Sequence, residues 1–323
     1  MRRCSCLTGF AQVLCADLAK QYLEVVEAYG CDSYCSTLTH LGAKVSLPEA
    51  GGSVLRRPIE GSSMTDLGGP YPWAGFKDWS AVGRELDAVE GVVSASVVVA
   101  PTSKVDVSTL REQFPDHLVD FKTHFLVDLT GDHVASRSSH HRRKARRCRP
   151  GLEVKVLKPT APIEARWVEL YALLRSRHQI RGGAAFSDAS LVAQLHLPAI
   201  THFGATVGDQ IVGIVSFMRE GPVAAYHLGA YDDIGYEFEA AYALFPYAFA
   251  TLADAGVELV NLGGGAGTQV AVDDGLARFK RGWSTHTGVA RIGGRVLNRE
   301  AFNKLGGAAT SRFWPPYRAR QTS

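Results

Sequence analysis

Apolar residues recur at helical spacing in some segments of the second half of the chain and form short continuous runs in others. Within 162–178, one side of a predicted helix carries Trp167, Leu170, Tyr171 and Leu174. Continuous apolar runs predict strands at 152–157, 202–207, 211–218, 223–231 and 257–262. A long helix is predicted at 236–256, with a kink at Pro246. This order of elements is typical of an α+β fold.

The first half of the chain has a similar mixture of elements. An amphipathic N-terminal helix is predicted from apolar residues three or four positions apart: Leu7, Phe10, Leu14, Leu18, Tyr22 and Val25. The remaining elements predicted are a helix at 79–89, strands at 92–100 and 121–129, and a helix that begins at Ser138 or Ser139. Pro150 and Gly151 end this last helix. We therefore predict two domains, 1–150 and 151–323.

Composition agrees with an ordinary globular protein. The chain has 323 residues, enough for two domains, and 46% of them are apolar. No apolar run approaches the roughly 18 residues that a membrane span needs. Arg2 and Arg3 precede an apolar stretch, but Asp17 and Lys20 follow it without a cleavage site. We therefore expect a cytoplasmic protein without a membrane span.

Five of the six cysteines lie in the first 35 residues, at Cys4, Cys6, Cys15, Cys31 and Cys35. A zinc site is one interpretation, because these residues include two close pairs. Neither pair has the CxxC spacing that small zinc sites favour. We therefore expect buried or incidental thiols and no metal.

Positive charge is concentrated in one segment, although the net charge is only +3. The segment 137–149 carries seven Arg or Lys residues and no acidic residue. Removing these seven charges from the net +3 leaves the rest of the chain at −4. A cationic cluster of this kind attracts nucleic-acid phosphates without reading sequence.

The glycine-rich stretch LGGGAGTQVAVDDGLARFKRGW does not match a nucleotide cradle. A P-loop needs Lys followed by Ser or Thr after its last glycine, whereas Gly267 is followed by Thr268. The dinucleotide motif needs a glycine at its sixth position, and Thr268 stands there. The pattern instead predicts a strand, a glycine turn, and a short helix capped by Asp273 or Asp274.

The predicted short helix carries a lysine on its apolar side. Leu276, Phe279 and Trp283 lie on one stripe at spacings of three and four. Lys280 is four residues after Leu276 and three before Trp283, so its stem points to the same side. A buried ammonium is costly unless it meets an anion or a wet cavity. The alternative is a lysine whose head reaches the surface.

The order of these motifs resembles that of the Fem-type aminoacyl-tRNA-dependent transferases, within the GNAT-like acyltransferases. The motifs are LxxFKxxW after LGGG, a preceding YHLGAY strand, a kinked helix, Gly69-Pro70, and a strand ending in VDLT before a basic helix. The resemblance covers about Gly68 to Trp283. It implies two GNAT-like domains, each a mixed or antiparallel sheet flanked by helices, with a cleft between them. The long coiled-coil arm of some members is missing, and the acceptor-binding residues are not matched.

The resemblance also implies an activity, the transfer of an amino acid from charged tRNA onto an amine. The acceptor can be a small peptide, a natural-product intermediate or a peptidoglycan precursor. The aminoacyl ester is already activated, so aminoacyl-tRNA is the co-substrate and no cofactor is expected. Lys280 is expected to stabilise the oxyanion or to grip the terminal phosphates. Phe279 is expected to pack against the terminal adenosine.

Other residues receive roles with open alternatives. Phosphate contacts with tRNA are assigned to Arg142, Arg143, Lys144, Arg146, Arg147 and Arg281, which alternatively form a solvated face or a strut between domains. His227 is the candidate general base, although a core histidine is the alternative. The candidate substrate-binding residues are Tyr226, Tyr71 and Trp73, which alternatively cover a core.

Two rival functions remain. An acyl-CoA-dependent GNAT enzyme would carry a [QR]xxGx[GA] turn for the pyrophosphate. Here the corresponding segment YDDIGYEFEAAY has only Gly235, surrounded by Asp232, Asp233, Glu237 and Glu239, which would repel a pyrophosphate. A non-catalytic RNA-binding protein would leave an inward Lys280 without a purpose. The sequence does not indicate an oligomeric state.

Overall fold

A computed structural model describes residues 29–147, 149–266, 274–307 and 314–321. The predicted N-terminal helix and four of the six cysteines, Cys4, Cys6, Cys15 and Cys148, lie outside the described residues. Cys31 is the N-cap of a short helix, and Cys35 lies within that helix and is buried. Among the residues described, no helix is long and apolar enough to cross a membrane.

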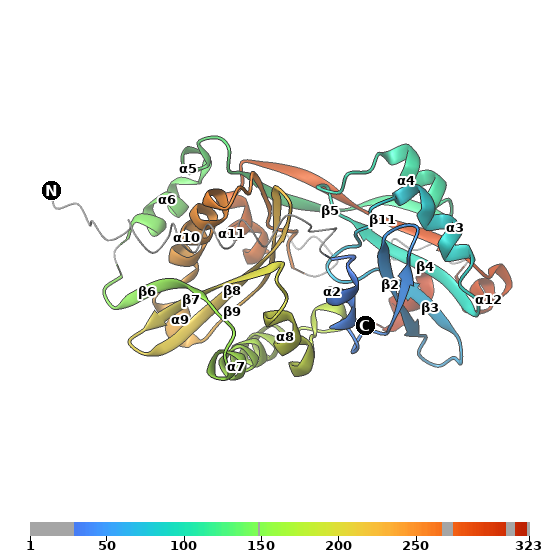
Figure 1. Ribbon diagram of the computed structural model, residues 1–323, viewed down its shortest axis with the longest axis horizontal. Helices are drawn as coiled ribbons and strands as arrows, with labels where there is room; N and C mark the ends of the chain where they lie inside the picture. The colour runs from blue at the N-terminus through green and yellow to red at the C-terminus, as the bar shows by residue number, and fades with distance from the viewer. Residues whose placement is uncertain (1–28, 148, 267–273, 308–313, 322–323) are drawn as a thin grey trace.

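One continuous sheet runs through the whole described molecule (Figure 1). Its strands are β1 (Ala43–Leu47), β2 (Gly52–Pro58), β3 (Thr65–Gly68), β4 (Val92–Val99), β5 (His117–Asp128), β6 (Leu152–Leu157), β7 (Ile200–Val207), β8 (Gln210–Glu220), β9 (Val223–Tyr231), β10 (Leu259–Asn261) and β11 (His286–Val296). Their order in the sheet is β1-β2-β3-β4-β11-β5-β10-β9-β8-β7-β6. The neighbours β3 and β4 run parallel, as do β9 and β10, and the other described pairs are antiparallel.

Helices cover this sheet in two lobes. The α-helices are α2 (Asp32–Ser36), α3 (Val82–Asp87), α4 (Val107–Gln113), α5 (His133–Ser136), α6 (Ser139–Arg146), α7 (Ala161–His178), α8 (Asp188–Leu195), α9 (Asp233–Glu237), α10 (Ala241–Asp254), α11 (Gly275–Trp283) and α12 (Arg299–Lys304). Short 3₁₀ helices are η1 (Trp79–Ala81), η2 (Gly182–Ala184) and η3 (Pro316–Gln321). One lobe contains β6–β10 and the other β1–β4, and the long strands β5 and β11 connect them (Figure 1).

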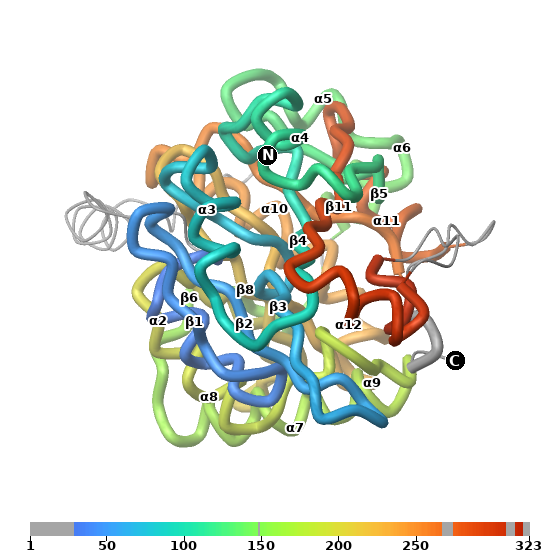
Figure 2. The backbone as a smooth tube through the Cα atoms, turned by 90° about the vertical axis from the view of Figure 1, so that its right-hand side faces the viewer, coloured from blue at the N-terminus to red at the C-terminus, as the bar shows by residue number. Residues whose placement is uncertain are grey.

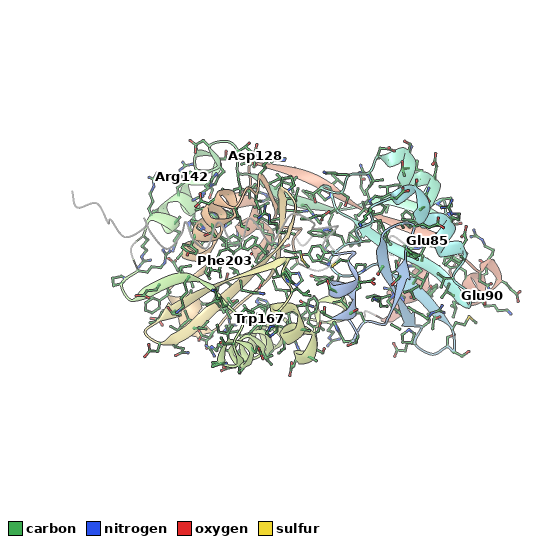
Figure 3. All side chains as sticks on the ribbon, in the orientation of Figure 1. Glu85, Glu90, Asp128, Arg142, Trp167 and Phe203 are labelled. Carbon is green, nitrogen blue, oxygen red and sulfur yellow. The ribbon has the colours of Figure 1, made fainter. Side chains whose placement is uncertain are left out.

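In the lobe built on β6–β10, two apolar cores lie on opposite faces of the sheet. Trp167 of α7 belongs to the core on one face, and Phe203 of β7 belongs to the other (Figure 3). The second core also contains Phe245 and Phe249 of α10 and Trp283 of α11. Burying aromatic rings on both faces fixes α7 and α10 to the sheet.

The other lobe is completed by the end of the chain. β11 pairs with both β4 and β5, so a strand from residues 286–296 lies between two strands from the first half. Figure 2 shows α12 beside β4 in this lobe, where Phe302 of α12 packs with Val93. The lobes in space therefore do not follow the order of the chain. The domain boundary at residue 150 stays a prediction.

Most predicted elements are present, with two differences in the second half. The predicted helix at 236–256 is instead two helices, α9 and α10, because Glu239 between them adopts a left-handed backbone with φ 52°. Pro246 lies inside α10. Leu276 was expected on the buried stripe of α11, but its side chain is 40% exposed.

Candidate active site

The candidate site lies where two parallel strands separate. β9 and β10 pair only from Val223 to Ala225 and from Leu259 to Asn261. β9 then continues through a register irregularity, because Ser216 pairs with Leu228 and Phe217 with Tyr226. His227 therefore has no partner in the β8 register, as in a β-bulge. β10 ends at Asn261 and leads into the glycine turn, which we define as residues 262–266.

The glycine turn is held by side chains from β10 and from α11 with its N-cap residue. The backbone amide of Gly263 donates to Asn261 Oδ1 over 2.8 Å, and Gly263 has φ 72°, a conformation that glycine adopts without strain. Lys280 Nζ donates to the carbonyl oxygen of Gly264 over 2.7 Å. Asp274 Oδ2 accepts from the amide of Ala266 at 2.7 Å. The turn is therefore fixed by hydrogen bonds and by its own backbone conformation.

Lys280 is buried, as the spacing of its helix predicted. The residue is 6% exposed, and its ammonium lies 5.6 Å from the centre of the Tyr226 ring. Burial, together with the nearby charge of Lys122 and against the opposite effect of Asp274, lowers the pKa of Lys280 to about 7. Lys280 therefore does not reach the surface, and it can gain or lose a proton near neutral pH.

Local interactions explain how α11 places this lysine. Asp274 caps the helix, because its carboxylate accepts from the amides of Leu276 and Ala277. At the other end, α6 approaches so closely that a Cβ on Gly282 would lie 2.0 Å from the His141 ring. His141 Nε2 in turn donates to the carbonyl oxygen of Phe279 at 2.9 Å. A glycine in FKRGW is thus needed for the packing of α6 on α11.

Phe279 packs in an aromatic cluster beside Lys280. Its ring centroid lies 5.0 Å from that of Phe245, 5.5 Å from Tyr242 and 5.6 Å from His141. The Phe279 side chain is only partly buried, although it packs against buried core residues such as Phe245. Its predicted contact with an adenosine stays a prediction.

His227 has the environment of a core histidine. Its Nδ1 lies 3.1 Å from the Tyr29 hydroxyl, and its Nε2 lies 2.8 Å from Gln194 Oε1. Since the Gln194 amide nitrogen donates to Ser190 Oγ, Oε1 is an acceptor and His227 Nε2 carries the proton. Burial lowers the pKa of His227 to about 3. Both ring nitrogens are occupied, so this geometry does not favour the predicted role as general base, which no observation tests directly.

The three candidate substrate-binding aromatics surround the junction of the lobes. Tyr226 lies under the Lys280 ammonium, and burial raises the pKa of its hydroxyl. Trp73 is buried, with its ring 5.5 Å from that of His124. Tyr71 packs against Phe186, with the ring centroids 5.6 Å apart. The structure brings Tyr226 to Lys280 and brings Trp73 to the neighbouring His124, whereas Tyr71 packs in the core of α7 and α8.

His124 and Asn261 were not identified from the sequence. Asn261 is fully buried, and its Oδ1 lies 3.1 Å from His124 Nδ1. His124 is on β5, and burial lowers its pKa to about 4, with a further contribution from the charge of Lys280. The signal in the sequence was weak. Lys122 and His124 are two positions apart in FKTHFLVDL, so they occupy one face of the strand.

The cations of the basic helix α6 are not equivalent. Lys144 and Arg147 form ion pairs with Glu239. Arg142 donates to the backbone carbonyls of Ala135 and Arg137 and lies at the periphery of the lobe (Figure 3). A surface hollow is lined by Ser139, Arg142, Arg143, Lys144, Arg146 and Arg147.

Two of these cations, Arg143 and Arg146, are exposed and form no hydrogen bond or ion pair within the part of the chain that the structure describes. Arg281 is also exposed, with its guanidinium 5.6 Å from the centre of the Phe125 ring. The predicted phosphate stripe is therefore divided. Some of its cations hold protein groups, and others face solvent.

The turn after β9, where an acyl-CoA enzyme would bind pyrophosphate, is occupied by a carboxylate. Asp232 caps α9 by accepting from the amide of Gly235 at 2.7 Å. The same carboxylate pairs with Arg166 and accepts from Gln210 Nε2 at 3.1 Å. The position of an anionic ligand is thus taken by the protein itself.

No protein-family model matches the sequence, and no curated protein matches it. Solved structures with a similar fold include FemX, which is 12% identical and has a TM-score of 0.62 over 92% of this chain and 98% of its own. The C-terminal domain of a putative lysylphosphatidylglycerol synthetase from Agrobacterium fabrum is 17% identical, with a TM-score of 0.58 over 91% and 96%. L-PGS from Bacillus licheniformis is 15% identical, with a TM-score of 0.55 over 86% and 95%. These likenesses confirm the predicted fold: the chain has an α+β fold similar to that of FemX.

Proposed function

We propose that this protein transfers an aminoacyl group from aminoacyl-tRNA to an amine and forms an amide bond. The observation that carries this proposal is the buried ammonium of Lys280, 6% exposed, at the glycine turn where β9 and β10 separate. A buried charge at such a place is expensive, and expensive charges gather at functional sites. The fold, which resembles that of FemX and of the C-terminal domain of a putative lysylphosphatidylglycerol synthetase, supports the same reaction class.

Lys280 suits the charge that this reaction develops. When an amine attacks an aminoacyl ester, the carbonyl oxygen becomes an oxyanion. An ammonium has three donors, and Lys280 uses one on the Gly264 carbonyl oxygen. Within the described part of the chain no group accepts from the other two, which we assign to the oxyanion. A donor fixed in a site of low dielectric stabilises this charge without reorganising.

RNA binding is assigned to the exposed part of α6. Arg143 and Arg146 are exposed there, and Arg281 lies on α11, the helix that carries Lys280, two residues before its end. Cations of this kind attract phosphates and orient an RNA without reading its bases. Acyl-CoA is the less favoured donor, because Asp232 already occupies the amide of Gly235 and presents a negative charge to a pyrophosphate.

The acceptor class is open in this proposal. An amine of a small peptide, a natural-product intermediate or a peptidoglycan precursor would each complete the reaction. Phosphatidylglycerol is included in the same test, because it appears in the name of one protein of similar fold, the putative lysylphosphatidylglycerol synthetase.

The decisive experiment measures the transfer of radiolabelled amino acids from a mixture of charged tRNAs. Parallel reactions receive an amine peptide, a peptidoglycan precursor or phosphatidylglycerol vesicles, and each is repeated after ribonuclease treatment. We expect product from at least one acceptor, and loss of product after ribonuclease treatment. Product that survives ribonuclease, or transfer from radiolabelled acetyl-CoA instead, would overturn the proposal.

A further inference from the structure

His124 lies beside the glycine turn and contacts both lobes. Its ring is 5.5 Å from that of Trp73, which precedes β4. On the other side, its Nδ1 is 3.1 Å from Asn261 Oδ1, the atom that holds Gly263. The residue is 5% exposed. His124 and Lys280 therefore bind the same short segment of backbone, one through Asn261 and the other through Gly264.

Hydrogen bonds fix which nitrogen of His124 carries the proton. The amide of Gly263 donates to Asn261 Oδ1, so this atom is the oxygen of the Asn261 side chain. The Asn261 amide nitrogen faces Thr102 Oγ1 at 3.4 Å, in agreement with that orientation. An oxygen can only accept from the ring, so His124 Nδ1 is protonated. In the neutral ring, Nε2 is then an acceptor.

Nothing in the described residues uses this acceptor. His124 Nε2 has no hydrogen bond within residues 29–147, 149–266, 274–307 and 314–321. Burial and the charge of Lys280 keep the ring neutral, since they lower the pKa of His124 to about 4. The charged and polar groups that face the ring are Lys280, Lys122 and Asn261, and none of them supplies a proton acceptor that competes with Nε2.

We propose that His124 is the general base of the reaction, with Asn261 as the positioning residue that sets its tautomer. This inference rests on the proposed aminoacyl transfer. The acceptor nitrogen attacks the ester carbonyl carbon and forms the C–N bond, and Nε2 takes the proton from that nitrogen. The C–O bond to the tRNA 3′ oxygen then breaks, and the proton passes from Nε2 to the departing oxygen.

The low basicity of His124 is compatible with this role. The N–H of the tetrahedral adduct is more acidic than that of the free ammonium, because two oxygens on the neighbouring carbon withdraw electrons. A weak base positioned beside it can therefore accept its proton. The imidazolium that forms lies near Lys280, and like charges disfavour it. The ring therefore releases the proton readily to the leaving oxygen. A base of this kind typically contributes about 10²–10⁴-fold to the rate.

The test uses His124→Asn, because an asparagine amide can still donate to Asn261 from the position of Nδ1 but has no Nε2. We expect turnover with aminoacyl-tRNA to fall by about 10²-fold or more, with the same melting temperature and RNA affinity. The matched control is His202→Asn on β7, where the buried ring lies 2.7 Å from Ser216 Oγ through Nδ1 and burial also lowers the pKa to about 4. That variant should keep its turnover per folded molecule.

Two readouts separate a base from a structural histidine. Added imidazole should partly restore turnover to His124→Ala and not to His202→Ala. Nitrogen NMR of the wild-type ring should show the neutral Nδ1–H tautomer at pH 7, and Asn261→Ala should lose this preference. Wild-type turnover in His124→Asn would overturn the inference while leaving the proposed function intact. Absence of tRNA-dependent transfer by the wild type would instead remove the proposed function.

Discussion

The turns that follow β9 and β10 are built in opposite ways, although the two strands are parallel neighbours. After β9, the Asp232 carboxylate binds the amide of Gly235 and the Arg166 guanidinium, so charges and dipoles compensate one another. After β10, the carbonyl of Gly264 meets the Lys280 ammonium, and this charge has no carboxylate bound to it in the described residues. The first turn is complete without a ligand. The second retains a costly positive charge, which is typical of a site that acts on something else.

Lys280→Met gives the largest expected effect, because it removes the charge that distinguishes the second turn. Turnover with aminoacyl-tRNA should fall by about 10²–10³-fold, the usual cost of losing an oxyanion donor. The measurement is steady-state transfer of radiolabelled amino acid, with circular dichroism to show that the fold is retained. Turnover within a few-fold of wild type would show that the two turns do not differ in function.

Asp232→Ala acts on the first turn and should affect stability instead. Removal of the Asp232 carboxylate leaves the amide of Gly235 without its acceptor, while the Arg166 guanidinium keeps its ion pair with Glu169. Leaving buried donors without a partner in this way costs about 1–3 kcal/mol. Urea denaturation should report the loss, while turnover per folded molecule stays close to wild type. A variant that is stable but inactive would place the turn after β9 in the active site.

The pH dependence of stability sharpens the same comparison. The pKa of Lys280 is lowered from 10.5 to about 7 in the folded protein, so between these pH values the unfolded chain binds more protons than the folded one. The free energy of unfolding should therefore rise with pH across this window. The advantage of Lys280→Met over wild type should shrink by about 2 kcal/mol between pH 7 and pH 9. A constant difference between the two proteins would show that Lys280 is not strained by burial.

The smallest expected effect is on tRNA affinity and concerns α6, where basic side chains with and without an ion-pair partner occur on one helix. Replacing Arg143 and Arg146 together by Ala should lower the slope of log affinity for tRNA against log salt by about 1 per cation. Lys144→Ala should change this slope less, because Lys144 is already paired with Glu239. Fluorescence anisotropy with labelled tRNA from low to moderate salt measures both. Equal changes in the two variants would mean that Glu239 does not compete for the cations.

Elements fixed by local interactions could be predicted from the sequence. The cap at Asp274 and the inward direction of Lys280 follow from residues within one helix, and α11 confirms both. The break between α9 and α10 could not be predicted, since the left-handed backbone at Glu239 accompanies ion pairs to α6 and to Arg149, which are distant in sequence.

The same limit applies to the candidate site. His124 and Asn261 are 137 positions apart, and only the pairing of β5 with β10 brings them together. β11 was also missed, because HTGVARIGGRV is rich in glycine and has no clear alternation. Its partners β4 and β5 lie more than one hundred residues earlier in the chain, so no local sequence pattern predicts this strand.

The insertion of β11 between β4 and β5 has a consequence for biosynthesis. During synthesis, β4 and β5 leave the ribosome before β11 has been made. Each of these two strands therefore keeps an unpaired edge while residues 129–285 are synthesised. Unpaired edges invite association with other chains. The lobe that comes first in the chain must therefore mature late, and a nascent polypeptide halted before residue 286 would be prone to aggregate.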